Sequence, residues 1–173
     1  MTFTIPAGRE VLERTPGALT GMLSGLSESW ISSREAEGSW SPRDVVAHLL
    51  GSEKHAWMPR IRHILEFGAT PALTPFDREA EIRASAHRPI GDLLTEFAAE
   101  RERSLLDLNA LGITDAQLEL TGTHPEFGLV RLRQLLSTWV VHDLSHTAQI
   151  VRVLGTQYQD DVGPWRANLR IVR

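Results

Sequence analysis

The segment from residue 132 to residue 154 most constrains the fold, because its apolar side chains recur with the spacing of a long helix. Positions three and four residues apart alternate along it and form the inward seam expected of a helix in a bundle. The seam consists of Leu132, Leu135, Trp139, His142, His146, Gln149 and Val153. Two of these positions therefore hold histidine where the pattern calls for Leu or Ile.

His142 and His146 are four residues apart, so on a helix their imidazoles lie one above the other on the same face. Two interpretations are open at this point. The imidazoles hold one metal ion together, or each is a hydrogen-bonded histidine of the core. A third ligand is needed to decide between them.

Three further segments have helical periodicity, and they span roughly residues 16–28, 42–67 and 90–110. Thr15-Pro16 predicts the start of the first, and Ser41-Pro42 followed by Asp44 predicts the start of the second. Four periodic helices with almost no strand pattern predict an all-α fold, a four-helix bundle.

The remaining segments predict connections and a tail. Pro59 is expected to kink the second helix, and the tail from residue 158 is expected to lie against the bundle with Trp165 as its anchor. The predicted connections are a loop at 31–40, a loop at 68–76, a short helical segment at 77–87 and a long connection at 111–130. No repeat or linker interrupts this order, so a single domain over residues 1–173 is expected.

The charged run from Glu100 to Arg103 lies in the third helix. Such a run is typical of a solvated helix face, and an exposed position is expected for Arg101 and Arg103. The alternative is that one of these arginines turns inward and meets an anionic substrate.

Charge and hydropathy exclude several classes of protein. The chain has 173 residues and a formal net charge of −4, which gives no electrostatic basis for binding nucleic acid. No run of about 18 uncharged apolar residues predicts a membrane span, and residues 1–10 lack the apolar core of a secretory signal. The chain has no cysteine, so His, Asp or Glu must hold any metal. We expect a cytoplasmic protein with no membrane partner.

His48 is the best candidate for a third ligand, because it lies in the first turns of the second helix beside the small residues Gly51 and Ser52. His55 is a second possibility on the same face, and as a fourth ligand it would close the site. The other histidines are near helix ends or in loops, and no function is expected for them: His63, His87 and His124.

The stretch from Trp40 to Leu49 (WSPRDVVAHL) resembles the W-S-x-x-(D/E)-V-(L/V)-x-H-L signature of the DinB/YfiT-like superfamily. The stretch from His142 to Ile150 (HDLSHTAQI) is similar to the H-x-x-x-H motif on the family's fourth helix, and Gly163-Pro164-Trp165 is similar to the tail of one branch. The resemblance covers nearly the whole chain, although only the two histidine motifs are specific. It implies a four-helix bundle whose metal ligands are His48, His142 and His146.

Three imidazole ligands leave a coordination position open, which is typical of catalytic metal sites. The donor set suits zinc, our default, and also nickel, cobalt or iron. The resemblance implies S-transferases or isomerases that use a low-molecular-weight thiol as cosubstrate, with hydrolysis as the other leading chemistry. Our hypothesis is a metal-dependent enzyme, a transferase or a hydrolase, that acts on a small molecule. The alternative is a non-catalytic metal-binding or ligand-binding bundle that forms a homodimer.

Asp143 makes the helix motif resemble the H-E-x-x-H of zinc proteases. Asp is one methylene shorter than the Glu base of those enzymes, and no histidine follows His146 as a further ligand. The protease interpretation is therefore poor. Two roles stay open for Asp143: a hydrogen bond behind the metal ligands that orients an imidazole or a water, and a salt bridge on the surface or between helices.

Overall fold

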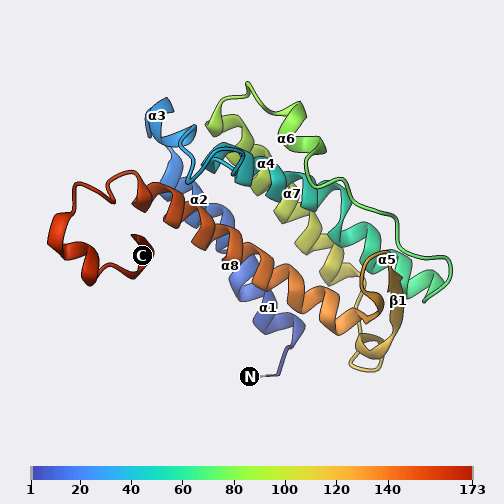
Figure 1. The fold of residues 1–173 in the computed structure, drawn as a ribbon. Coiled ribbons are helices and arrows are strands. Elements are labelled where there is room, and N and C mark those ends of the chain that lie inside the picture. The colour runs from blue at the N-terminus through green and yellow to red at the C-terminus, as the bar shows by residue number, and fades with distance from the viewer. Residues whose placement is uncertain (1, 173) are drawn as a thin grey trace.

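The computed structural model describes residues 2–172 and forms a helical bundle (Figure 1). Its helices are α1 (Ile5–Leu12), α2 (Thr15–Leu23), α3 (Glu28–Ile31), α4 (Pro42–His55), α5 (Trp57–Phe67), α6 (Ala80–Ala84), α7 (Ile90–Ala110) and α8 (Leu132–Thr156). The strands are β1 (Thr121–His124) and β2 (Gly128–Arg131), and short 3-10 helices are η1 (Gln117–Glu119), η2 (Gly163–Ala167) and η3 (Arg170–Val172). None of the described helices has the length and apolar character needed to cross a membrane.

Four helical columns make up the bundle. The first is α1 followed by α2, the second is α4 followed by α5, and α7 and α8 are the third and fourth (Figure 1). The predicted all-α four-helix bundle is confirmed. The predicted ranges of the third and fourth helices agree with α7 and α8 to within two residues at each end.

The start of α4 follows directly from its sequence. The Ser41 hydroxyl accepts a hydrogen bond from the Asp44 amide at 3.2 Å, and the Asp44 carboxylate accepts one from the Ser41 amide at 2.9 Å. This capping box, with Pro42 in the first turn, satisfies backbone groups that have no partner within the helix. It fixes the direction in which α4 leaves the loop, and it thereby places His48 two turns later.

Three predicted boundaries are wrong, and one of them is the end of the first predicted helix, which falls at Leu23 rather than at residue 28. The first column begins earlier, with α1, and Thr15 is not a cap: its hydroxyl donates to the Val11 carbonyl. The second column breaks at Ala56 rather than at Pro59. Proline has no amide hydrogen and its ring clashes with the carbonyl four residues earlier, so the disruption falls at the end of the preceding turn.

The long connection before α8 contains a β-hairpin that the sequence pattern did not predict. β1 and β2 pair in antiparallel register, with Thr121 opposite Arg131. The hairpin lies against α5 and the loop that follows it: the Leu73 amide donates to the Thr123 carbonyl at 2.9 Å. Gly122 permits this contact, because a Cβ there would lie 2.6 Å from the side chain of Ile64.

The core has two apolar clusters, one toward each end of the bundle. The cluster near the hairpin includes Trp57, Ile61, Ile64, Leu105, Leu132 and Trp139. The other cluster includes Leu19, Leu23, Val46, Leu49, Leu93, Phe97 and Ile150. On α4, α7 and α8 alike, a buried charged residue lies in sequence between the two clusters.

The buried charges are Arg101, Glu53 and Asp143, and the predicted exposed position of Arg101 is wrong. The Arg101 side chain is only 2% exposed and forms ion pairs with Glu53 at 2.7 Å and with Asp143 at 2.6 Å. Arg101 also donates to the Leu12 carbonyl at 2.9 Å, so one guanidinium connects α1, α4, α7 and α8. Arg103 is exposed as predicted and pairs with Glu100 on its own helix. All four consecutive residues of this run are charged, so the sequence pattern alone could not show which of them faces the core.

The tail returns to α8, but Trp165 does not anchor it. Trp165 is 68% exposed, whereas Val172 is 4% exposed. η3 lies beside Gly155, where an added Cβ would be 3.3 Å from Ile171. The tail therefore contacts the bundle through its last described residues.

Replacing Arg101 with methionine should lower the free energy of unfolding by about 3–5 kcal/mol, because it leaves two buried carboxylates without their cation. Chemical denaturation followed by circular dichroism measures this loss. The matched control is Arg103→Met on the same helix, whose exposed ion pair should contribute less than about 1 kcal/mol. Equal effects of the two substitutions would contradict the role given to Arg101.

Candidate metal centre

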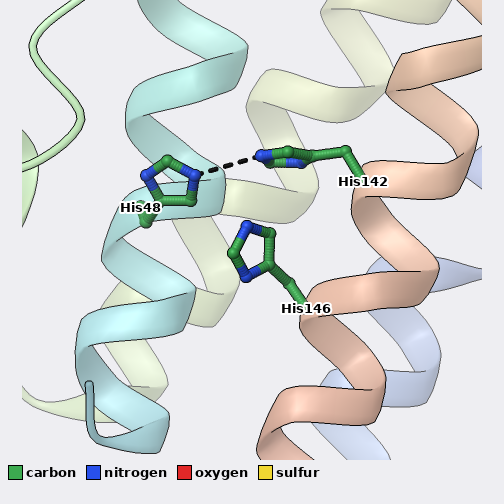
Figure 2. A group of neighbouring side chains, drawn as sticks. All are labelled: His48, His142 and His146. Carbon is green, nitrogen blue, oxygen red and sulfur yellow. Dashed lines mark hydrogen bonds between the residues drawn. The ribbon is translucent and has the colours of Figure 1, made fainter. Parts of the chain in front are cut away.

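Three histidines from two helices meet between α4 and α8. His48 comes from α4 and is 4% exposed, and His142 and His146 come from successive turns of α8 and are partly buried. One ring nitrogen from each lies within 4.8 Å of the other two. Figure 2 shows the three imidazoles directed into the same space from facing helices. The structure thus brings together the three residues that the sequence singled out.

Hydrogen bonds on the outer side fix the protonation of two of the rings. His48 Nδ1 lies 3.0 Å from the Arg78 carbonyl oxygen, and His146 Nδ1 lies 2.8 Å from Gln149 Oε1. Since both oxygens only accept, each Nδ1 carries the proton and each Nε2 has a free lone pair when the ring is neutral. Metal-binding histidines typically have this arrangement, with one nitrogen held by a carbonyl or amide oxygen and the other free for the ion.

The distance between the facing nitrogens of His48 and His142 indicates whether the three histidines can bind a cation. Their Nε2 atoms are 3.0 Å apart, and His142 Nδ1 is buried without a hydrogen-bond partner among the described residues. Two bare lone pairs repel at this distance, so a proton or a cation must lie between them. Ligand nitrogens around a tetrahedral zinc, with bonds of about 2.0–2.1 Å, are about 3.3 Å from one another. The His48–His142 distance is close to that spacing, all three nitrogens lie within 4.8 Å of one another, and the donor set fits the ion.

Burial keeps all three imidazoles neutral at pH 7. It lowers the pKa of His48 from 6.5 to about 4, although the bond to the Arg78 carbonyl opposes this shift. It lowers the pKa of His142 to about 2, with a further contribution from His146, and it also lowers the pKa of His146. A neutral imidazole is the form that binds metal, so these nitrogens need lose no proton to do so.

The three histidines form one wall of a cavity of about 380 Å³. Its other walls are mainly apolar and aromatic. Trp40 lies against His48 and His146, with ring centroids 4.7 and 5.9 Å apart, and Trp57 meets His142 edge-on at 5.1 Å. Residues from the loop after α5 and from the hairpin complete the lining, and they include Phe76, Arg78, His124 and Phe127. A concave, largely apolar pocket with a few polar groups is typical of small-molecule sites.

The other candidates do not join the group. His55 is exposed on α4 and supplies no fourth ligand, His63 Nε2 donates to the Pro71 carbonyl, and His87 is exposed. Asp143 is fully buried, but its carboxylate binds Arg101, so the interhelical salt bridge is the role that the structure shows. His124, for which the sequence predicted no function, lines the cavity. Only the unpredicted hairpin brings it there, so its position along the chain carried no signal.

Comparison with known proteins agrees with this arrangement. The sequence model of the DinB superfamily matches residues 11–150. This chain belongs to the DinB superfamily. Its segments before residue 11 and after residue 150 flank the part that the superfamily model describes.

Individual members of the DinB superfamily resemble this chain over most of its length. YfiT of Bacillus subtilis, named as a candidate metal-dependent hydrolase, is 28% identical over 149 residues, which are 83% of this chain and 80% of YfiT. A Bacillus cereus protein with the same description is 28% identical over 141 residues, or 80% of this chain and 79% of that protein. The solved structure of YfiT, described as a probable metal-dependent hydrolase with an unusual four-helix bundle topology, matches with a TM-score of 0.76 and 25% identity. That match covers 88% of this chain and 86% of YfiT, and it confirms the predicted DinB/YfiT-like fold.

In metal-free protein, the free energy of unfolding should fall as the pH is lowered from 6.5 toward 4. Unfolded histidines take up protons through a pKa of 6.5, while His48 stays neutral in the folded state until about pH 4, so acid favours unfolding. Denaturation in the presence of a chelator at several pH values measures the slope.

Replacing His48 with glutamine should make that slope smaller, and replacing the exposed His55 with glutamine should leave it unchanged. A slope that is the same in the parent and in His48→Gln would show that His48 is not held neutral in the folded protein.

Proposed function

We propose that the protein is a metal-dependent hydrolase of a small molecule, with a divalent ion held by His48, His142 and His146. The observation that carries the proposal is the convergence of three neutral imidazole nitrogens within 4.8 Å at the wall of a cavity. The names of its relatives as metal-dependent hydrolases support the same reaction class. Zinc is the proposed ion, since three nitrogen ligands suit it well.

The cavity favours catalysis over a sealed structural site. No carboxylate or cysteine of the described residues completes the histidine group, so a coordination position would stay open toward the cavity. A bound divalent ion would supply a Lewis acid, able to polarise a carbonyl and to lower the pKa of water to about 7. An all-protein ligand shell would instead favour the non-catalytic alternative.

The chain's own side chains have three tasks in this proposal. The histidines present lone pairs on Nε2 of His48 and His146, with Nδ1 of each fixed by an oxygen acceptor. Trp40 and Trp57 pack against the rings of His48 and His142 and make the cavity wall beside them apolar. The lining has no Asp or Glu, so His124 is the other residue of the cavity that can transfer a proton near pH 7.

Four further assignments stay predictions. Thiol transfer with a low-molecular-weight cosubstrate would use the same metal, but no group in the lining distinguishes a thiol from other substrates. A homodimer also stays a prediction, and so do the cytoplasmic location and the single domain over residues 1–173.

Metal content tests the proposal most directly. Untagged protein should hold about one equivalent of zinc by elemental analysis, and His142→Ala should lose it because two of the three nitrogens cannot retain the ion. His55→Ala, an exposed histidine of α4, is the matched control and should keep the metal.

A screen of small esters, amides and lactones, run with and without added low-molecular-weight thiols, should then show hydrolysis by the parent and a loss of at least 100-fold in His142→Ala. A parent protein that binds no zinc, or that remains fully active without its metal, would contradict the proposal. Turnover that occurs only with a thiol would favour the transferase.

A further inference from the structure

A cluster of hydrogen-bond donors lines the cavity beside the three histidines. Arg60 comes from α5, Arg78 from the loop between α5 and α6, and His124 from β1. Neither the DinB superfamily match nor the histidine group accounts for them. A helix, the loop that follows it and a strand of the hairpin thus bring positively charged or donor groups to one cavity, in a chain whose net charge is −4.

The guanidinium of Arg60 is a cation without a counterion. It is half-buried, and among residues 2–172 no carboxylate lies within ion-pair distance of it. One of its terminal nitrogens donates to the Thr74 carbonyl at 3.3 Å, and its Nε is buried without any partner. Burial lowers the pKa of Arg60, and the positive charge of Arg78 lowers it further. The two guanidinium groups therefore repel each other, which an anion between them would relieve.

Arg78 is only weakly engaged. Its side chain pairs with Glu126 of the hairpin turn at 3.2 Å, and the two side chains are 65% and 59% exposed. Exposed pairs of this kind contribute less than about 1 kcal/mol, so the guanidinium can turn toward a ligand at little cost. Its backbone carbonyl is already fixed beside the site by the bond from His48.

His124 presents a donor as well. Its Nδ1 accepts hydrogen bonds from the amides of Glu126 and Phe127, at 3.1 and 3.3 Å. Burial lowers the pKa of His124, so the ring is neutral at pH 7 and its proton is on Nε2. The turn of the hairpin thus holds the ring in the tautomer that donates from Nε2.

The remaining walls are apolar. Trp40, Trp57, Phe76 and Phe127 line the cavity, and no Asp or Glu does. A ligand that fits both the apolar walls and the cluster of donors needs an apolar body and a negatively charged group. Of the two arginines in the lining, Arg78 pairs with Glu126 and Arg60 lacks a counterion, so the geometry calls for one negative charge. A carboxylate provides this charge with the planar shape that a guanidinium binds best.

We propose that the cavity binds a small carboxylate with an apolar or aromatic body, and that Arg60 holds the carboxylate with Arg78 and His124 as further donors. The aromatic walls hold the body, which extends toward His48, His142 and His146. The proposal names the substrate class of the proposed hydrolase and rests on it for the reaction, but the binding step needs no metal.

Binding of 3-phenylpropanoate and of its neutral analogue 3-phenylpropanamide to chelator-treated protein tests the proposal. Quenching of tryptophan fluorescence, checked by calorimetry, reports binding because Trp40 and Trp57 line the cavity. The parent should bind the acid at least tenfold more tightly than the amide, as expected for charge-assisted hydrogen bonds.

Three variants locate the carboxylate. Arg60→Gln should remove the preference for the acid and leave the affinity for the amide unchanged, and Arg60→Lys should keep part of the preference. Arg62→Gln is the matched control, because Arg62 lies on the same helix but pairs with Asp107 and is outside the lining. It should bind both probes as the parent does.

Equal binding of the two probes by the parent, no binding of either, or an unchanged preference in Arg60→Gln would overturn the proposal. A preference that appears only after zinc is added would also overturn it, because the ion rather than Arg60 would then hold the carboxylate. Metal analysis of the same samples separates the two proposals: a protein that prefers the acid but never binds metal keeps the carboxylate site and loses the metal-dependent reaction.

Discussion

The buried guanidinium of Arg101 is the interaction on which the arrangement of the helices depends. It binds Glu53 of α4, Asp143 of α8 and the backbone of α1 at Leu12, and Glu53 also accepts a hydrogen bond from Trp139 at 2.9 Å. A buried ion pair stabilises a fold little compared with apolar packing, but an unpaired buried charge is very unfavourable. Other rotations of α7 or α8 would leave such a charge, so we interpret the network as fixing the register of the helices.

This register has a direct effect on the histidines. Asp143 follows His142 in the sequence, so the bond that holds Asp143 inward toward α7 also sets the rotation of the turn that carries His142 toward α4. Trp139, one turn earlier, stacks on Trp57 at 5.8 Å, and Trp57 contacts the His142 ring. The charged network and the histidine group are therefore neighbouring layers of one helix interface, and the first keeps the second in place.

The sequence alone predicted the features that depend on local periodicity. The bounds of α7 and α8, the capping box at Ser41 and the inward direction of His142 and His146 all follow from spacing along one helix, and His48 was selected by its small neighbours and by a motif. Features that depend on contacts between distant segments could not be predicted in this way. The inward rotation of Arg101 is decided by Glu53 and Asp143, which lie 48 and 42 residues from it in sequence.

The β-hairpin also depends on contacts between segments that are distant in sequence. Its strands are four residues each and are stabilised by the loop after α5 and by Ile64, not by a strong strand pattern of their own. The sequence consequently predicted no function for His124 and did not single out Arg60, although both line the cavity. The exposure of Trp165 has the opposite cause, since an apolar side chain near the end of a chain need not be buried when a neighbour such as Val172 makes the contact.

Because of the hairpin, part of the cavity lining can change independently of the helices that hold the three histidines. The ends of the hairpin are paired with each other, at Thr121 and Arg131, so its turn can be lengthened or rebuilt without moving α7 or α8. The helices would keep the three histidines, while the turn would change the part of the cavity lining that it supplies. The fold is therefore modular, and a combinatorial library confined to residues 125–127 would vary the cavity lining at Phe127 while keeping His124 and the three histidines.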